Sequence, residues 1–513
     1  MRAAGAVVLS ALVLAATAGA APTWRPTIEL SASQRALGPE LAVNAAGDAI
    51  VVWNREEGAV CPTEPASLSC IHIVETASRN RGASAWQPPV EVGRPGIGNR
   101  PRVAINDGGS AAILWVHDIG DDRVVQAKIR PGLTGTWPNA NDLSGTPREV
   151  RNHAVALDAV GNAAAVWAQR DAATFYVVGD FRVAGRGYWE APVALSSMSG
   201  HASTGPSLAI APNTFALAAW VENGQVRVAS GQATTGVWDA PATLASGVGD
   251  GTDVDVAVNF AGDAVVVWSS VSAGVQAVVR PRGGGWSAPV RLGSGTDVDV
   301  ALDTTGNAVA VWLASHAGGV LMSARYRRGP AAWSRRFVVA RDAAAPSLAM
   351  NSDGNAVALW SRRPTNVVTS ALRPVSLGTW VRYTVLSGRG ASSPTVAMSQ
   401  RGDAFAAWNR NVPPRITVES RTLTGTGPVL ARLSVPSEVF VGRVRSFSVV
   451  SAAWGSPLAG LPRWRFGDGV IATGSTVSHA YASPGVYRVT VTARDAAGGI
   501  STLARSISVS RSR

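Results

Sequence analysis

The chain has 513 residues, a formal net charge of +12, and 46% hydrophobic residues against 16% charged ones. This length suits one large domain and one smaller domain. Beyond the first 20 residues no segment is apolar and long enough to cross a bilayer, which argues against membrane insertion. The arginine excess comes without a nucleic-acid recognition motif, so we do not expect nucleic acid as a partner.

The first 20 residues have the features of a secretory signal peptide. Arg2 precedes an apolar run at 3–16, and Ala-Gly-Ala at 18–20 has the small-x-small form of a cleavage site. We therefore expect residues 1–20 to be removed and the mature protein to be secreted. It is expected to be extracellular or associated with the cell envelope.

The two cysteines of the chain, Cys61 and Cys70, follow in the first part of the mature sequence. In an exported protein, two cysteines separated by eight residues predict a local disulfide that closes one loop. We expect no metal site there, because the neighbouring His72 would add a third ligand and no fourth is at hand.

From residue 24 to residue 424 the chain repeats one pattern eight times. Each copy has an alternating apolar segment, a Gly-Asn or Gly-Asp turn, a second alternating segment and a Trp, most clearly at 254–268 and 298–312. A repeat of 44 to 62 residues with a period of two predicts a ring or array of small antiparallel sheets. These hairpin tryptophans are Trp53, Trp115, Trp167, Trp220, Trp268, Trp312, Trp360 and Trp408.

The turn in most copies begins with Asp or Asn and contains a Gly three residues later, as at Asn44 and Gly47. The Asp or Asn side chain can accept a backbone hydrogen bond, and the Gly supplies a left-handed conformation. These residues therefore have a full structural explanation, and we do not expect them to be ligands or catalysts. The fourth copy departs from the pattern, with Ala211, Asn213 and Thr214 at its turn.

A second series of tryptophans marks two further strands in each copy. Four short strands joined by Gly-rich turns predict a β-propeller blade. The strand at 24–31 stands alone at the start, and the last copy lacks the strand that should follow 415–423. We therefore predict eight four-stranded blades closed by the N-terminal strand. The second series is Trp24, Trp86, Trp137, Trp189, Trp238, Trp286, Trp333 and Trp380.

One of these turns, RGGGWSAPVRL at 282–292, resembles the degenerate Asp-box turn of sialidase-like propellers. In that family the turn reads roughly S-x-D-x-G-x-x-W followed by S-x-P, and here the Ser and Asp are mostly absent. The resemblance extends over residues 24–424. It implies the blade type but no particular activity, because Asp boxes in that family lie on the face opposite the active site.

Two stretches near the C-terminus, RWRFGDG at 463–469 and HAYASPGVYRVTVTARDAAG at 479–498, resemble the PKD domain, an Ig-like β-sandwich. The resemblance implies that the Trp and Phe of the first stretch lie in the core and that its Asp-Gly forms a turn. It also implies a role as an extracellular spacer or adhesive module. The residues with implied structural roles are Trp464, Phe466, Asp468, Gly469, His479, Tyr481 and Tyr487.

These patterns predict four parts: a signal peptide at 1–20, a propeller at 21–424, a linker at 425–429 and a PKD-like sandwich at 430–513. From residue 425 onward ten arginines stand against three acidic residues, a net charge of +7. A basic domain of this kind favours anionic surfaces such as wall polymers.

Several arginines follow shortly after their hairpin Trp, in the loops where a propeller carries its variable residues. A sialidase-like enzyme needs three arginines for the substrate carboxylate, a Tyr/Glu nucleophile pair and an acid. Glu56 or Glu57 match as carboxylates, but no Tyr is suitably placed. Solvated loop arginines are the alternative interpretation. The candidates are Arg55, Arg170, Arg362, Arg363 and Arg410.

The string GTDVDVA occurs twice, at 251–257 and 295–301. Alternation places both aspartates of each copy on one face of a strand. If that strand is innermost, the four carboxylates meet near one end of the channel, as Ca²⁺ ligands or as a glycosidase-type acid/base pair. The alternative is a recent duplication of one solvated strand start, and no other cofactor is expected. The candidates are Asp253, Asp255, Asp297 and Asp299.

The sequence as a whole predicts an all-β, secreted, non-catalytic binding or adhesion protein. Its expected partner is an extracellular glycan, a cell-wall polymer or a protein. Two alternatives are a sialidase-like glycoside hydrolase or lyase acting on extracellular polysaccharide, and a purely structural adhesin. The enzyme hypothesis predicts Arg, Tyr or Glu, and Asp side chains converging at one mouth of the channel, and a mouth lined by Ala and Ser contradicts it.

Overall fold

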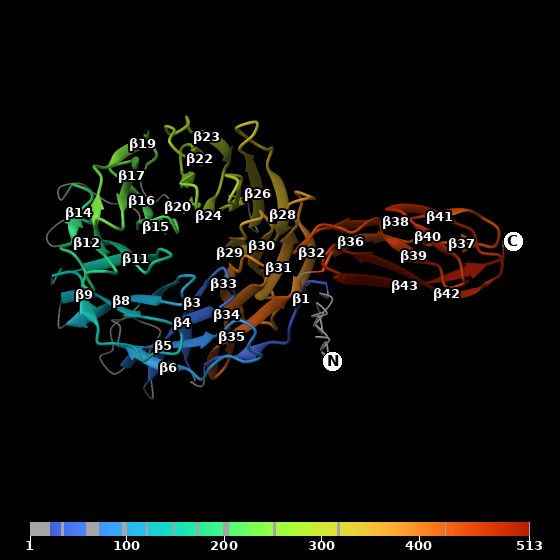
Figure 1. Ribbon diagram of the computed structural model, residues 1–513, viewed down its shortest axis with the longest axis horizontal. Helices are drawn as coiled ribbons and strands as arrows, with labels where there is room; N and C mark the ends of the chain where they lie inside the picture. Colours follow the sequence, from blue (N-terminus) through green and yellow to red (C-terminus); the bar gives the residue numbers. More distant parts are fainter. Residues whose placement is uncertain are drawn as a thin grey trace, which may run out of the picture. The chain divides into compact units, whose positions relative to one another are not determined.

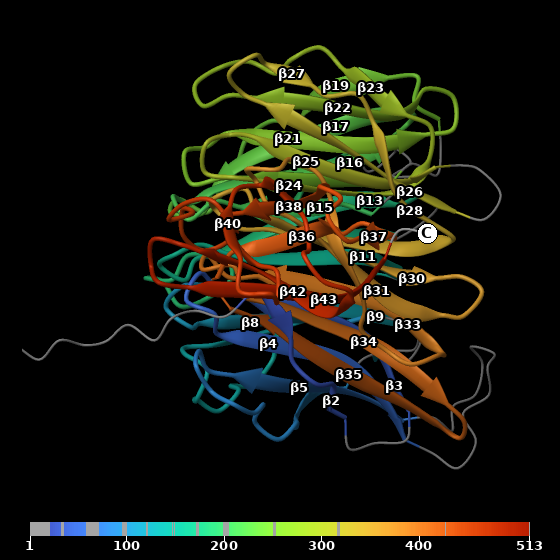
Figure 2. The same ribbon diagram turned by 90° about the vertical axis from the view of Figure 1, so that its right-hand side faces the viewer.

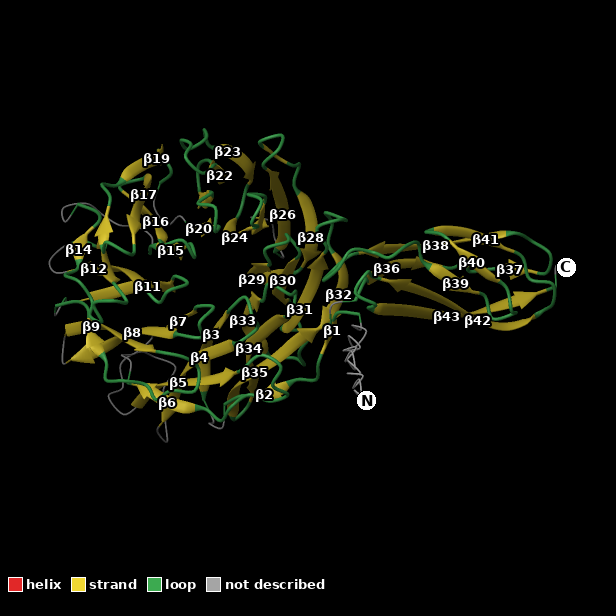
Figure 3. Cartoon of the chain, in the orientation of Figure 1, coloured by secondary structure: helices red, strands yellow, loops and turns green. Residues whose placement is uncertain are grey.

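The computed structural model describes residues 21–31, 35–57, 71–94, 100–119, 122–145, 147, 149–170, 174–197, 205–249, 253–314, 319–425 and 427–511. The expected signal peptide at 1–20 and the expected disulfide between Cys61 and Cys70 lie outside these residues. Throughout the described ranges the regular structure is β-strand, with no α-helix (Figure 3). No helix in them is therefore long and apolar enough to span a membrane.

The propeller unit, Trp24–Thr424, contains eight antiparallel sheets in its described residues, which we number 1 to 8 in chain order of their first strands. Each first strand lies beside the first strand of the next sheet, and β33 lies beside β3, so the sheets close into a ring (Figure 1). The first strands are β3 (Ala36–Val43), β7 (Arg102–Ile105), β11 (Glu149–Leu157), β15 (Ser207–Ile210), β20 (Val254–Val258), β24 (Thr296–Leu302), β29 (Ala343–Met350) and β33 (Ala391–Met398).

The second strand of each sheet carries the hairpin Trp and is buried on both faces, because a neighbouring sheet covers each side. Its sequence is accordingly a near-continuous apolar run, as in AVVVW of β21. The hairpin tryptophans are all at most 2% exposed. The second strands are β4 (Ala49–Glu57), β8 (Ala111–Ile119), β12 (Ala163–Arg170), β16 (Phe215–Glu222), β21 (Ala264–Ser270), β25 (Ala308–Ala314), β30 (Ala356–Arg362) and β34 (Ala404–Val412).

The third and outer strands complete each sheet toward the rim. The third strands are β5 (Ile71–Arg79), β9 (Asp122–Arg130), β13 (Tyr176–Arg182), β17 (Gln225–Gln232), β22 (Gly274–Arg280), β26 (Val320–Arg327), β31 (Val367–Arg373) and β35 (Arg415–Thr424). The outer strands of sheets 1 to 7 are β6 (Val90–Gly93), β10 (Asn141–Asp142), β14 (Val193–Ala194), β18 (Val237–Trp238) with β19 (Ala242–Ser246), β23 (Val290–Gly293), β27 (Ala332–Trp333) with β28 (Phe337–Arg341), and β32 (Val381–Val385).

Sheet 8 is completed by the N-terminal segment, as predicted. β1 (Thr23–Trp24) and β2 (Ile28–Glu29) both pair with β35, and Ile28 lies opposite Ser420. Backbone hydrogen bonds from Arg25 to Thr422 and from Leu30 to Val418, both 2.8 Å, continue the pairing. The first and last parts of the propeller sequence are thereby joined in one sheet, which covers the edge that β35 would otherwise expose.

The Asn residue that opens many hairpin turns also joins one sheet to the next. Asn44 Oδ1 accepts the backbone N–H groups of Gly47 and Asp48, which is the predicted turn role. Its Nδ2 also donates to the backbone oxygen of Asn106 in the next sheet, at 3.1 Å. Equivalent bonds run from Asn106 to Asp158 and from Asn259 to Asp303. The turn residue is therefore part of the contact between sheets.

The fourth copy forms the same turn with different residues. The Ala211 N–H donates to the Phe215 oxygen at 2.8 Å, and Thr214 takes the left-handed conformation at φ +78° where the other copies have Gly. A threonine in this region is strained, because its branched Cβ crowds the backbone. The turn is thus maintained by its place in the ring in spite of its local sequence.

The second unit includes the described residues from Gly425 onward and has two sheets; its strands β36, β38, β42 and β43 are labelled in Figure 2. One orders β36 (Val429–Ser434), β38 (Arg445–Ala452) and β41 (Thr476–His479). The other orders β37 (Val439–Phe440), β43 (Ile500–Ser510), β42 (Gly485–Arg494), β39 (Arg463–Arg465) and β40 (Ile471–Thr473). Two packed sheets of this kind form a β-sandwich.

The core of the sandwich contains the aromatic residues that the sequence placed there. Trp464 and Phe466 are fully buried, and the Trp464 Nε1–H donates to the Gly474 oxygen at 2.8 Å. His479 stacks on Phe466, with ring centroids 4.1 Å apart, and its Nε2 lies 2.7 Å from Asp468 Oδ2. Burial and mutual hydrogen bonding account for these residues without a ligand.

Candidate functional site

A cavity of about 500 Å³ lies where the first strands of sheets 1 to 6 begin, within the propeller unit. Strand alternation explains which residues reach it. The residues twelve positions before each hairpin Trp, such as Val256 and Val300, are buried between sheets. Their neighbours thirteen positions before the Trp therefore face the channel. This channel ring consists of Glu40, Arg102, Ala154, Ser207, Asp255, Asp299, Ser347 and Thr395.

The two GTDVDVA copies contribute neighbouring carboxyl groups to this ring. Asp255 on β20 accepts hydrogen bonds from Ser207 Oγ and from the Val300 N–H, both at 2.9 Å. Asp299 on β24 accepts the Leu348 N–H at 2.8 Å and is hydrogen-bonded to Asp255. Each carboxyl thus reaches the backbone of the next sheet, and the two also contact each other.

Burial raises the pKa of both carboxyls, and the charge of Asp255 raises the pKa of Asp299 further. The hydrogen bonds from Val300 and Ser207 act in the opposite direction on Asp255, because they stabilise its ionised form. A hydrogen bond between two carboxyl groups needs one proton between them, so the two aspartates titrate as a pair.

Asp253 and Asp297 lie nearer the mouth and are exposed. Asp253 Oδ2 accepts the backbone N–H of Asp297 at 2.9 Å. Partial burial and then the charge of Asp253 raise the pKa of Asp297, while Arg363 acts against this rise. Asp253, Asp255 and Asp297 therefore line one wall, with Asp253 and Asp297 at the entrance, and Asp299 contacts Asp255.

The wall formed by sheets 1 and 2 lies opposite the aspartates, because sheets 1 and 2 are four places away from sheets 5 and 6 in the ring. There Arg102 Nη1 lies 3.0 Å from Glu40 Oε2. His153 of sheet 3 is buried nearby, and burial followed by the charge of Arg102 lowers its pKa to about 3, so its ring is neutral. Glu40, Arg102 and Asn152 line the cavity and were not among the sequence candidates.

A β-bulge near the start of several first strands sets the orientation of the residues at the cavity entrance. The pairing register shifts in several of these strands, for instance between Thr296 and Asp299. The residue fifteen positions before the hairpin Trp is left-handed at each such bulge, as Asp297 is at φ +51°. In sheet 4 this position is Gly205, where a Cβ would lie 1.9 Å from the Asn152 Cβ. The left-handed residues are Gly38, Asn152, Asp297, Ala345 and Ser393.

Three of the arginines that follow hairpin tryptophans, Arg55, Arg170 and Arg410, lie close to a glutamate of their own sheet. Arg55 Nε lies 2.8 Å from Glu75 Oε1, and Trp53 Nε1 donates to the same carboxylate. Arg170 Nη2 lies 2.5 Å from Glu149 Oε2. These ion pairs orient the guanidinium groups along the sheet.

The other three candidates in this series are likewise outside the cavity. Arg410 Nε lies 3.9 Å from Glu419 Oε1, and Arg362 is exposed. Among the described residues that line the cavity, the arginine present is Arg102, and none of the five candidates, Arg363 included, is among them. Of the arginine candidates, Arg363 is near enough to the aspartates for its charge to act on Asp297.

Across the described ranges, no three His, Cys, Asp or Glu side chains are grouped so that they could hold a metal ion. The aspartates are instead engaged with backbone N–H groups, a serine and one another. Chemically, the cavity offers hydrogen-bond acceptors at its entrance, one proton-sharing pair in its wall, and an ion pair opposite.

The sandwich unit can be assigned to a family. Residues 428–509 match the PKD domain. The PKD domain thus covers both C-terminal stretches that resemble it, and its core contains their Trp and Phe. Among curated proteins nothing matches this chain.

Among solved structures, the chain is similar to an ulvan lyase of polysaccharide lyase family PL25. The identity is 11%, the TM-score is 0.44, and the match covers 78% of this chain and 96% of the lyase. The NanB sialidase of Streptococcus pneumoniae has 9% identity and a TM-score of 0.38, with 77% and 69% covered. A fungal alcohol oxidase of the AA5 family has 11% identity and a TM-score of 0.42, with 95% and 99% covered.

Proposed function

We propose that this protein is a secreted, non-catalytic carbohydrate-binding protein whose propeller holds a neutral, hydroxyl-rich glycan at the mouth of the channel. The observation that carries this proposal is the cavity of about 500 Å³ with carboxylates at its entrance. Sugar hydroxyls donate to carboxylates in short charge-assisted hydrogen bonds. A concave cavity of this size suits a few sugar units better than it suits a protein surface.

The charge of the cavity favours a neutral glycan over an acidic one. Asp253 and Asp297 at the entrance would repel a carboxylate or sulfate group. Arg102 already forms an ion pair with Glu40. The PKD domain fits the role of a spacer that presents the propeller outside the cell. This role also agrees with the signal peptide that the sequence predicts.

The test is a glycan array probed with the full mature chain and with the double variant Asp253→Asn, Asp297→Asn. Asparagine keeps the backbone contact of Asp253 and tolerates the left-handed conformation of Asp297, so the fold should persist. We expect the wild type to retain neutral glycans and the variant to bind them at least about tenfold more weakly, the loss of one or two charged hydrogen bonds.

The matched control is Asp353→Asn, an exposed Asp on the hairpin turn of sheet 7 at the other end of the strands. This control should bind glycans like the wild type. Wild-type chain that retains no neutral glycan, or a double variant that binds as tightly as the wild type, would contradict the proposal.

One observation favours a second candidate, an enzyme acting on polysaccharide, because Asp255 and Asp299 share a proton beside a cavity. Their contact argues against a glycosidase that uses this pair, whose two carboxyls stand roughly 5 to 9.5 Å apart to accommodate the sugar or water. A sialidase-type site also lacks its Tyr among the described lining residues. We therefore favour binding.

The enzyme candidate is tested by incubating the mature chain with neutral and acidic polysaccharides and measuring new reducing ends. We expect none. Cleavage that the Asp299→Asn variant loses would replace the binding proposal with the enzymatic one.

A further inference from the structure

A second cavity, of about 300 Å³, lies between sheets 6 and 7 at the hairpin-turn end of the strands, away from the channel mouth. Its rim is formed by turn residues, among them Asn307 and Gly354. Three guanidinium groups line it: Arg325 and Arg327 from β26, and Arg373 from β31. We call this cavity the Arg373 pocket.

Arg373 is buried, at 5% exposure, yet it is poorly satisfied. Its Nη1 donates to the Gly354 oxygen at a long 3.3 Å, and its Nε has no acceptor in the described part of the chain. No carboxylate of the described residues lies within ion-pairing distance of it. A buried charge in this state is costly, because protein interiors normally supply either a counter-charge or full hydrogen bonding.

The charges around Arg373 increase this cost. Burial is the main cause that lowers its pKa to about 10, and repulsion by Arg325 adds to it. Asp303 acts in the opposite direction, but its oxygens already accept hydrogen bonds from Thr305 and Asn307 within the turn. Three positively charged residues therefore line the pocket, and the carboxylate of Asp303 beside them already accepts hydrogen bonds within its own turn.

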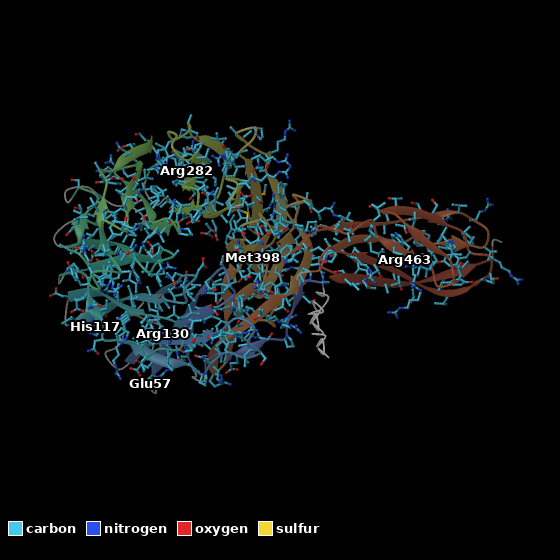
Figure 4. All side chains as sticks on the ribbon, viewed as in Figure 1. Glu57, His117, Arg130, Arg282, Met398 and Arg463 are labelled. Carbon is cyan, nitrogen blue, oxygen red and sulfur yellow. The ribbon has the colours of Figure 1, made fainter. Side chains whose placement is uncertain are left out.

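Arginines also occupy the same position in sheets 1, 2, 3 and 5; Arg182 of sheet 3 is half-buried, and those of the other three sheets contact protein groups. The residue opposite the Ala that lies four positions before the hairpin Trp is Arg79 in sheet 1, Arg130 in sheet 2 and Arg280 in sheet 5. Arg130, marked in Figure 4, stacks at 4.5 Å from the centroid of its neighbouring Trp ring, although its Nε and Nη2 have no acceptor among the described residues. Arg79 donates twice to a backbone oxygen, and Arg280 lies over a Phe ring. Arg373 stacks on no aromatic ring of the described residues, and the cavity adjoins it instead.

We propose that the Arg373 pocket binds an oxyanion, a carboxylate or sulfate group, carried by an acidic polysaccharide. Guanidinium groups bind such anions through paired N–H donors, and an anion here would supply the missing acceptor and counter-charge together. A volume of about 300 Å³ exceeds that of a small inorganic ion and lies at the lower end of pockets that hold organic ligands. The pocket is thus sized for the anionic group and part of its sugar.

The inference is independent of the neutral-glycan site proposed above, since the two sites lie at opposite ends of the strands and carry opposite charge. The channel mouth selects against acidic sugars, and the Arg373 pocket selects for them. A polymer with both neutral and acidic units would be able to engage both.

The experiment is titration calorimetry on the full mature chain at constant ionic strength, with sodium glucuronate, sodium sulfate, glucose and a polyglucuronate oligosaccharide as probes. The wild type should bind glucuronate and sulfate, and the oligosaccharide at least tenfold more tightly than either free anion, while any binding of glucose should be the same in the wild type and in the Arg325→Gln, Arg327→Gln variant. The Arg325→Gln, Arg327→Gln variant should bind the oligosaccharide at least tenfold more weakly. The exposed Arg336→Gln variant of the same sheet serves as the matched control and should bind like the wild type.

A wild type that binds none of the anions, or a double variant that matches the wild type, overturns the proposal. Free sulfate that binds as tightly as the oligosaccharide overturns its polysaccharide part. Arg373→Met provides a second variant: it removes the buried charge, so it should melt at or above the wild-type temperature without anion and gain no stability from sulfate. If the Arg325→Gln, Arg327→Gln variant binds neutral glycans like the wild type, the two sites are independent.

Discussion

At the scale of single residues, some charged side chains form ion pairs and others are buried with few hydrogen-bond partners. Arg55 and Arg170 follow their hairpin tryptophans as predicted, but Glu75 and Glu149 hold them in ion pairs. Neither glutamate is adjacent in sequence to its arginine, so the pairing depends on strand register. By contrast, Asp180 on β13 is 1% exposed, and neither carboxyl oxygen has a full hydrogen bond to another described residue.

Asp180 should make the stability of the propeller depend on pH. Burial raises its pKa to about 8, and Glu190 adds to the rise. Because this folded-state value exceeds the unfolded value of 3.8, the folded chain keeps a proton that the unfolded chain releases. The contribution of Asp180 to stability is therefore fully present below about pH 4 and is lost by up to roughly 1.4 kcal/mol per pH unit as the pH rises toward 8.

The Asp180→Asn variant removes this titration. We expect its melting temperature to exceed that of the wild type at pH 8 and the difference to shrink toward pH 5, as measured by differential scanning calorimetry across that range. The exposed Asp353→Asn variant should follow the wild type at every pH. A constant difference between the Asp180 variant and the wild type at all pH values would contradict the assignment.

At the scale of elements, the hairpin turns carry both a local and a long-range role. The Asx residue closes its own turn, which its sequence spacing predicts, and its amide also bonds the next sheet. Alternation and turn chemistry act within a few residues and can therefore be read from sequence. The bond to the next sheet joins residues 44 to 62 positions apart and depends on how the sheets pack.

Asn259 offers a test of this double role. Its side chain accepts the Asp263 N–H and donates to the Asp303 oxygen in the next sheet, at 3.0 and 2.9 Å. Asn259→Ala should lower the free energy of unfolding by about 1 to 3 kcal/mol, because buried partners lose their hydrogen bonds. Urea denaturation measures this change.

The control is Asn213→Ala in the divergent turn of sheet 4, where the side chain is exposed and makes one long contact at 3.4 Å. Its effect should stay within about 0.5 kcal/mol, as for most surface substitutions. Equal effects of the two substitutions would show that the bond between sheets contributes nothing.

At the scale of the whole molecule, closure of the ring joins the two ends of the propeller sequence. Without β1 and β2, the edge of β35 would expose unpaired backbone groups and invite aggregation. Removal of residues 21–31 should therefore lower the melting temperature and produce oligomers, which size-exclusion chromatography with light scattering would detect.

A synthetic peptide of residues 21–31 added to the shortened chain should restore much of the melting temperature, because strand pairing needs no covalent link. A shortened chain that remains monomeric and melts like the wild type would contradict the role of the N-terminal segment in closure.

The sequence by itself determined the repeat, the strand alternation, the turn residues, the closing strand and the PKD domain, because all of these depend on local patterns of one or two strands. Alternation also predicted that the aspartates of each GTDVDVA copy share one face of their strand. The mutual hydrogen bond of Asp255 and Asp299, the pairing of the arginine candidates and the stranded charge of Arg373 were decided only by the tertiary structure. Each depends on which sheets become neighbours and how far each strand is shifted against the next, and a one-residue bulge changes both.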